Sequence, residues 1–335
     1  MDVRLSAEQR ALRETAVDLV DALRPQSVID LSSVERATKL DAALIATGWR
    51  TLREADEDGA PYASAVEVAI VAEELGRGLA DTPFIGPTLA ADLRRLAGAP
   101  PADGAETIAL TSDLGSVATA GRPGVAIDAA GAPAALVCGA DGLYVVALGE
   151  AAVEVDLTRP QLAVTHEPTA AAVAALPGDD AMRRWTALGL ALSCADLVGV
   201  MRGATTLAAD YAKVRKQYGA EIGSYQAVQH LLADAFVAME GSRSAALHAA
   251  WAVDALPADE ALAAAAGAKA YCARAARSVC ETSIQVHGGI GNTWECLAHV
   301  YLRRALVSID LLGGVGPSLE RVLDHNLAGA GHELR

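Results

Sequence analysis

The sequence of 335 residues is poor in aromatic side chains, at 4%, and has no excess of positive charge. Its formal net charge of -15 argues against nucleic acid as a partner, because the phosphate backbone attracts basic surfaces. No uninterrupted apolar run of about 18 residues occurs, so we expect no membrane span. The amino terminus leads into an amphipathic helix without a signal-peptide core, which favours a cytoplasmic protein.

Several chemical signatures are also missing. The five cysteines are irregularly spaced and form no Cys-x-x-Cys pair, so we expect reduced, buried thiols. The seven histidines are scattered, and we predict no metal site. The sequence has no P-loop, no Gly-x-Gly-x-x-Gly after a strand and no Gly-x-Ser-x-Gly elbow, so it gives no support to nucleoside triphosphatase, Rossmann or serine hydrolase chemistry.

Hydrophobic residues, chiefly alanine, make up 52% of the chain and favour closely packed helices. We predict a mainly α protein with a small β domain. Its parts are an N-terminal helical domain (1–100), a small antiparallel β domain (101–178) and a C-terminal four-helix bundle (179–335).

Periodicity and turn signals predict individual elements. Ser6 and Gln9 form a predicted capping box before the first helix, and the segment 82–87 is expected to break the chain. Further helices are predicted at 33–47, 64–76, 88–96, 182–214, 224–253, 259–287, 297–311 and 317–327. Strands are predicted at 134–138 and 143–148, joined as a hairpin, and at 153–156 and 161–165.

Two segments have patterns that suit a phosphate-bearing ligand. In the first, Arg215, Tyr218 and Gly219 end one helix, and Gln226 follows at the start of the next. In the second, Gln285 precedes Gly288, Gly289 and Gly291. Both have an ordinary interpretation as helix ends and turns. In the alternative interpretation, the arginine grips a phosphate and the glycines let the backbone approach a ligand.

Together these segments resemble the acyl-CoA dehydrogenase family, whose pattern is Arg-x-x-aromatic-Gly, a glutamine on the next helix, and Gln-x-x-Gly-Gly-x-Gly. The segment Leu302-Arg303-Arg304-Ala305 is similar to the family's following arginine segment, and Asp156-Leu157-Thr158-Arg159 to its sequence near the end of the β domain. The resemblance is strong over residues 180–330 and weak between about 105 and 155. The family also has the domain order predicted above.

The resemblance implies FAD as cofactor and α,β-dehydrogenation of an acyl-CoA thioester: a carboxylate removes the α-proton, and a hydride passes to the flavin. Arg215 would contact the FAD pyrophosphate, with Gln217 and Tyr218 nearby, and Gln226 would lie near the adenosine half. Gln285, Gly288 and Gly289 would close on the same cofactor. By resemblance, these residues serve an FAD held mainly by a neighbouring subunit.

The family's catalytic glutamate is absent at both of its usual positions. One corresponds to Leu312, before Gly313 and Gly314, and the other to Gly189 on the first long bundle helix. Neither leucine nor glycine can remove a proton. Asp310 lies two residues before Leu312. Residues two apart on a helix point to different faces, so Asp310 is only a weak alternative base. We therefore predict no catalytic residue in this chain.

Two other groups of polar residues favour ordinary roles. His287 beside Gly288 could be a catalytic histidine, but a histidine at a helix end is more often structural. Arg303 and Arg304 could meet a CoA phosphate or an acid at an interface, and surface charge is the default expectation for them.

The missing carboxylates resemble the smaller subunit of actinobacterial heterotetrameric acyl-CoA dehydrogenases, which act on steroid-derived CoA esters. The resemblance implies a second dehydrogenase subunit in an α2β2 assembly, an acyl-CoA substrate, and electron-transfer flavoprotein or a similar acceptor. Two alternatives remain open: an active homomeric dehydrogenase with an atypical base, and a non-catalytic scaffold.

Overall fold

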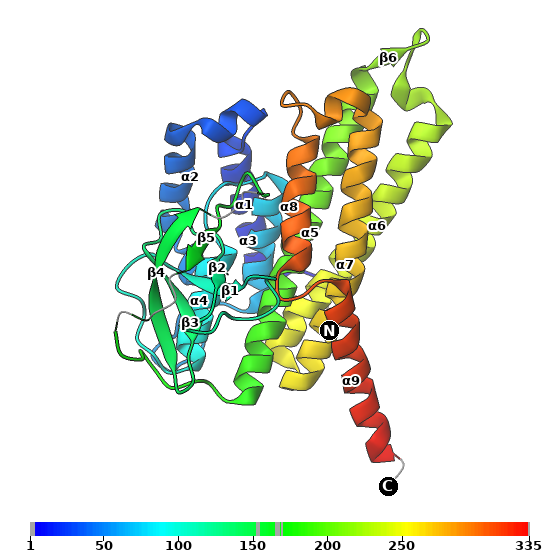
Figure 1. The fold of residues 1–335 in the computed structure, drawn as a ribbon. Helices are drawn as coiled ribbons and strands as arrows, with labels where there is room; N and C mark the ends of the chain where they lie inside the picture. The colour runs from blue at the N-terminus through cyan, green and yellow to red at the C-terminus, as the bar shows by residue number, and fades with distance from the viewer. Residues whose placement is uncertain (1–3, 152–154, 165–167, 169, 334–335) are drawn as a thin grey trace.

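The computed structural model describes residues 4–151, 155–164, 168 and 170–333. The N-terminal part contains α1 (Ala7–Leu23), η1 (Val28–Ser32), α2 (Val34–Ala46), η2 (Trp49–Thr51), α3 (Ala65–Arg77) and α4 (Ile85–Leu96). The predicted capping box is present: the Ser6 side chain accepts from the Gln9 backbone, and the Gln9 side chain accepts from Ser6 N–H. In Figure 1 these helices, drawn in blue and cyan, lie on one side of the bundle.

The β region is a small closed barrel in the strand order β1-β2-β5-β4-β3. Its strands are β1 (Glu106–Thr111), β2 (Gly124–Ala126), β3 (Ala134–Cys138), β4 (Leu143–Ala151) and β5 (Leu162–Val164). The predicted hairpin at 134–148 is confirmed, since β3 and β4 pair antiparallel from Ala134↔Ala147 to Cys138↔Leu143. Of the predicted strand at 153–156, residues 153 and 154 lie outside the described residues, and the prediction is wrong for Val155 and Asp156, which are not in a strand. Thr165, at the end of the next predicted strand, also lies outside the described residues.

The C-terminal part is a bundle of long helices: α5 (Asp179–Val214), α6 (Gln226–Ala255), α7 (Ala258–His287) and α8 (Ala298–Asp310), followed by α9 (Val315–Glu333). A short hairpin, β6 (Lys216–Gln217) and β7 (Ala220–Glu221), and the turn η3 (Ile222–Ser224) join α5 to α6, and η4 (Gly288–Asn292) follows α7. Figure 1 shows the hairpin projecting from one end of the bundle and α9 extending away from the other end.

Helix α5 is the centre of the fold and contacts α3, α6, α7 and α8. By length and composition alone it would suit a membrane span, but 94% of its apolar window is buried inside the protein. It therefore serves as the core helix of the bundle. Glycine allows α3 to cross it closely, because a Cβ on Gly199 would overlap the Glu73 carbonyl.

The mainly α fold with a small β region is confirmed, and two details of the prediction are wrong. Helix α4 begins at Ile85, inside the segment 82–87 that was expected to break the chain. Pro87 lies in the first turn of α4, where a missing N–H leaves no helical hydrogen bond unmade. The barrel is also not purely antiparallel, because β1 pairs with β3 in parallel to close it. The domain boundaries at 100 and 178 stay a prediction.

Candidate functional site

The first predicted segment forms the exposed end of α5 and the start of α6. Arg215 is the C-cap of α5, and its N–H donates to Tyr211 O at 2.9 Å. Its carbonyl accepts from Ile222 N–H at 2.8 Å, so the backbone is fixed on both sides. The hairpin turn uses positive φ at Tyr218 (52°) and Gly219 (81°), and the Tyr218 side chain is 98% exposed.

The second predicted segment lies at the same end of the bundle, on the last turn of α7 and the start of η4. Gln285 is exposed, and Gly288 ends α7 with φ 66°. His287 is buried and stacks on Tyr211 with ring centroids 4.5 Å apart. Its Nδ1 lies 2.7 Å from Ser283 O. The stack is a packing contact that joins the end of α7 to the end of α5.

The chemistry of this bundle end suits an anionic dinucleotide. The Arg215 guanidinium has no ion-pair or hydrogen-bond partner in the part of the chain that the structure describes, whereas nearby Lys213 pairs with Asp210 at 2.8 Å. A Cβ on Gly288 or Gly289 would meet nothing within 4 Å. The surface therefore offers a free cation, an exposed amide and open backbone. It can contact FAD lying against it from outside.

Gln217 and Gln226 also lie at this end of the bundle and are exposed. Gln217 donates to the neighbouring Lys216 carbonyl, and its own carbonyl accepts from the Tyr225 hydroxyl at 2.9 Å. Every predicted cofactor residue is thus exposed and lies at the same end of the bundle, which we call the open bundle end. We define it as Arg215, Gln217, Tyr218, Gln226, Gln285, Gly288 and Gly289.

The two empty base positions turn out to be neighbours. Gly189 is buried on α5, and a Cβ there would overlap Cδ1 of Leu312. Leu89 of α4 lies against the same point, 3.5 Å from the place that this Cβ would take. Leu312 is 1% exposed. The Leu312 side chain therefore fills the space over Gly189. We call this pair of residues, together with Leu89 beside it, the closed pair site.

Several contacts hold Leu312 in that position. Its backbone is left-handed, with φ 57°, and its N–H donates to Leu114 O of the barrel at 2.7 Å. Its carbonyl accepts from Arg321 Nη1 at 2.8 Å. The buried Lys269 ammonium donates to the carbonyls of Leu311 at 3.0 Å and Ser308 at 2.5 Å. Burial lowers the pKa of Lys269 to about 8.

Asp310, the weak alternative base, is exposed at the last residue of α8. It is two residues from Leu312, but its side chain belongs to the surface, whereas Leu312 is buried. Among the described residues, no group of three or more potential metal ligands comes together.

A buried ionic network was missed in the sequence. Asp196 of α5 accepts from Arg304 at 2.7 Å and 3.0 Å and lies 3.3 Å from Arg159 Nη1. Arg159 also pairs with Asp156 at 2.7 Å. The expectation that Arg304 is surface charge is wrong, because it is 3% exposed. These cations lower the pKa of Asp196 against the opposing effect of burial. The network joins barrel to bundle.

The chain thus has a helical part, a small barrel and a bundle with an open end, and this arrangement defines a structural class of protein. The Acyl-CoA dehydrogenase, C-terminal domain model matches residues 181–314. The chain is 30% identical over 325 residues to acyl-CoA dehydrogenase IpdE2 of Mycobacterium tuberculosis, covering 94% of this chain and 96% of the relative. The chain therefore belongs to the acyl-CoA dehydrogenase family.

Solved structures share the fold. A variant of the Tcur3481-Tcur3483 steroid ACAD has a TM-score of 0.81 at 23% identity, covering 97% of this chain and 99% of that chain. The ChsE4-ChsE5 complex from Mycobacterium tuberculosis has a TM-score of 0.77 at 24% identity, covering 98% of this chain and 99% of that chain. Family membership confirms the predicted class, an oxidoreductase acting on acyl-CoA, and FAD as its cofactor.

Proposed function

We propose that this chain is a non-catalytic subunit of a FAD-dependent acyl-CoA dehydrogenase. It completes the FAD site of a partner subunit through the open bundle end and supplies no base for α-proton removal. FAD, when bound, accepts the hydride from the substrate β-carbon. Arg215 would neutralise its pyrophosphate, and Gln285 would orient it by hydrogen bonding.

The observation that carries this proposal is the closed pair site. A base must reach the proton that it abstracts, within a hydrogen-bond distance or through one water. Leu312 fills the buried space over Gly189, so both usual base positions lie in packed core. The open bundle end, in contrast, keeps exposed glycines and an arginine that has no partner among the residues that the structure describes, and packing alone does not require either.

We further propose that the partner is a second dehydrogenase subunit in an α2β2 assembly, and that the substrate is a steroid-derived CoA ester. One of the similar structures is of a steroid ACAD, and another is of a two-component complex. Electron-transfer flavoprotein is the proposed acceptor, and cytoplasm the proposed location. The structure of the electron transferring flavoprotein of Acidaminococcus fermentans includes a chain with the same fold, at a TM-score of 0.71 and 18% identity.

Co-expression with a candidate partner dehydrogenase tests the proposal. The purified pair should contain FAD and oxidise the CoA ester, while this chain alone should do neither. Arg215→Ala should leave the complex intact but weaken FAD retention by roughly 10- to 100-fold, because hydrogen bonds to charged groups contribute about 1.5–3 kcal/mol. Lys213→Ala is the matched control, since Lys213 is an exposed cation already paired with Asp210.

The two alternatives give different results. If the chain is an active homomer that uses Asp310, the isolated chain turns over substrate, and Asp310→Asn abolishes turnover while FAD stays bound. If the chain is a scaffold, Arg215→Ala leaves the FAD content of the complex unchanged. Either outcome would refute the helper role.

A further inference from the structure

A cavity of about 300 Å³ lies between the N-terminal helices and the barrel, on the far face of α4 from the closed pair site. Leu89 faces Gly189, whereas Pro87, Ala91 and Arg94 follow the i, i+4, i+7 spacing of the opposite helix face and line the cavity. Its remaining walls come from α2, the segment 48–55, the loop 99–106 and residues 128–132. This volume is at the lower end of the range for small-molecule sites.

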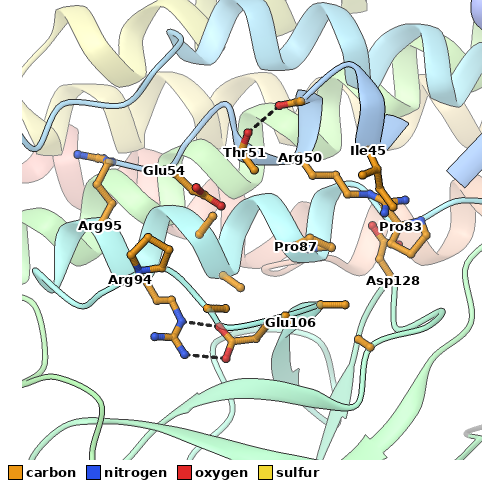
Figure 2. Close-up of a pocket in the computed structure, with 18 of the residues that line it drawn as sticks. Ile45, Arg50, Thr51, Glu54, Pro83, Pro87, Arg94, Arg95, Glu106 and Asp128 are labelled. Carbon is orange, nitrogen blue, oxygen red and sulfur yellow. Dashed lines mark hydrogen bonds and ion pairs between the residues drawn. The ribbon is translucent and has the colours of Figure 1, made fainter. Parts of the chain in front are cut away.

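The walls are aliphatic and carry little free charge. Alanines and prolines dominate the lining, and aromatic side chains are absent from it among the described residues. Arg94 is fully engaged by Glu106, at 2.6 Å and 2.8 Å, and by the Pro100 carbonyl at 2.9 Å. Figure 2 shows this ion pair at the base of the cavity. Such a pocket suits a compact, non-planar apolar body.

The two other lining arginines also have partners. Arg50 donates to the Pro83 carbonyl at 2.7 Å and pairs with Asp41. Arg95 pairs with Asp92 at 2.8 Å. Because these arginines are already paired with carboxylates, the described lining offers no free cation to attract a phosphate or carboxylate.

Glu54 is the lining charge that stands without a side-chain hydrogen bond or ion pair within the described residues. It is half-buried, and Figure 2 shows its carboxylate turned toward the middle of the cavity. Burial raises the pKa of Glu54. An unpaired carboxylate in an apolar pocket is stabilised by a ligand that donates a hydrogen bond to it.

We propose that this cavity binds a compact alicyclic molecule whose hydroxyl or ammonium group donates to Glu54. The site is independent of the proposed helper role, because it uses none of the residues of the open bundle end or the closed pair site.

Three probes that share the adamantane cage test the proposed binding. They are 1-adamantanol, 1-adamantanamine and 1-adamantanecarboxylate, each titrated into the full chain by calorimetry at pH 7. The alcohol and the amine should bind saturably, and the carboxylate at least about tenfold more weakly, because it cannot donate and is repelled by Glu54. Equal affinity for all three, or no saturable binding of the alcohol and amine, would overturn the proposal.

Variants locate the site. Glu54→Ala should weaken the alcohol and the amine by about tenfold or more and reduce their advantage over the carboxylate. Glu57→Ala, an exposed glutamate of the same loop, is the matched control and should change nothing. Ala91→Phe should block binding by filling the cavity from α4, and Ala102→Leu does the same from the opposite loop should the first variant not fold. Binding that survives in a folded cavity-filling variant would contradict the assignment.

Discussion

The closed pair site makes a prediction about coupling between two residues that are far apart in the chain. Gly189→Ala adds a methyl group where Leu312 Cδ1 already lies, so the core is overpacked. Overpacking costs typically about 1–3 kcal/mol. Leu312→Ala removes a side chain that is 1% exposed, and such truncations cost about 2–5 kcal/mol.

The double variant should not show the sum of these losses. With Leu312 truncated, the methyl group at position 189 has room, and Leu89 at 3.5 Å becomes an ordinary contact. Alanine inside a helix is then favoured over glycine by about 0.5–1 kcal/mol. The same Gly189→Ala change should therefore destabilise the wild-type chain and stabilise the Leu312→Ala chain. Residues in contact show coupling energies of about 0.5–3 kcal/mol.

The assay is a double-mutant cycle from urea denaturation followed by circular dichroism, with midpoints compared at equal slope. A chain of this size requires a check that two spectroscopic probes give the same transition. Gly267→Ala on α7 is the control, because a Cβ there would meet only Val322 at 3.9 Å, and it should be neutral or slightly stabilising in both backgrounds. Additive effects at 189 and 312 would refute the claim that Leu312 occupies the space over Gly189.

Two further variants test the buried charges. Asp196→Asn should lower the free energy of unfolding by about 3–5 kcal/mol, because it weakens a buried pair with Arg304, measured by the same denaturation; an effect under about 1 kcal/mol would contradict a buried network. Lys269 has a folded-state pKa of about 8 against 10.5 in the unfolded chain, so the unfolded chain binds more protons between these pH values. The free energy of unfolding of the wild type, relative to that of Lys269→Met, should therefore rise by up to about 3 kcal/mol between pH 8 and 10.5. A difference that stays constant over this range would refute the lowered pKa.

Long periodic segments made the helices predictable from sequence. The bundle helices α5, α6 and α7 begin and end within about three residues of the prediction, because their apolar period and their glycine or proline boundaries agree. The start of α4 was not predictable in the same way. Proline breaks a helix interior but is accepted in its first turn, and the sequence alone does not say which applies to Pro87.

The position of the open bundle end was predictable because its residues are few and follow a spacing along three helix ends. The barrel closure and the buried charges were not. Parallel pairing of β1 with β3 depends on contacts between distant strands, which leave no local pattern. Arg304 was expected at the surface, since arginine is almost never fully buried unless paired, and its partner Asp196 lies far away in the chain.

The sequence predicted only part of the closed pair site. The sequence showed that Gly189 and Leu312 lack carboxylates, but not that one residue fills the space over the other. Because the two positions are neighbours, the absence of a side chain at Gly189 leaves the space that the Leu312 side chain occupies. Positions 189 and 312 therefore lie in a packed core rather than beside a vacant pocket.

This packing predicts that a carboxylate introduced at position 312 does not act as a base. In Leu312→Glu the new side chain starts from a buried backbone held by Leu114, Lys269 and Arg321. Burial raises the pKa of a carboxyl, so the introduced acid should stay protonated at neutral pH. In a complex whose partner subunit has had its own base replaced, Leu312→Glu should therefore not restore flavin reduction by an acyl-CoA under anaerobic conditions.

The pH dependence of Leu312→Glu gives a second measurement. With its folded-state pKa above the usual value near 4.3, the unfolded chain releases the proton first as the pH rises. The free energy of unfolding of the variant, relative to wild type, should therefore fall as the pH rises from about 4 toward neutrality. Leu312→Gln, which has the same size without the titration, should show a pH-independent loss. Flavin reduction restored by Leu312→Glu in the complex that lacks the partner's base would contradict this prediction, because it would require a carboxylate that is ionised and within reach of substrate in a space that Leu312 now fills.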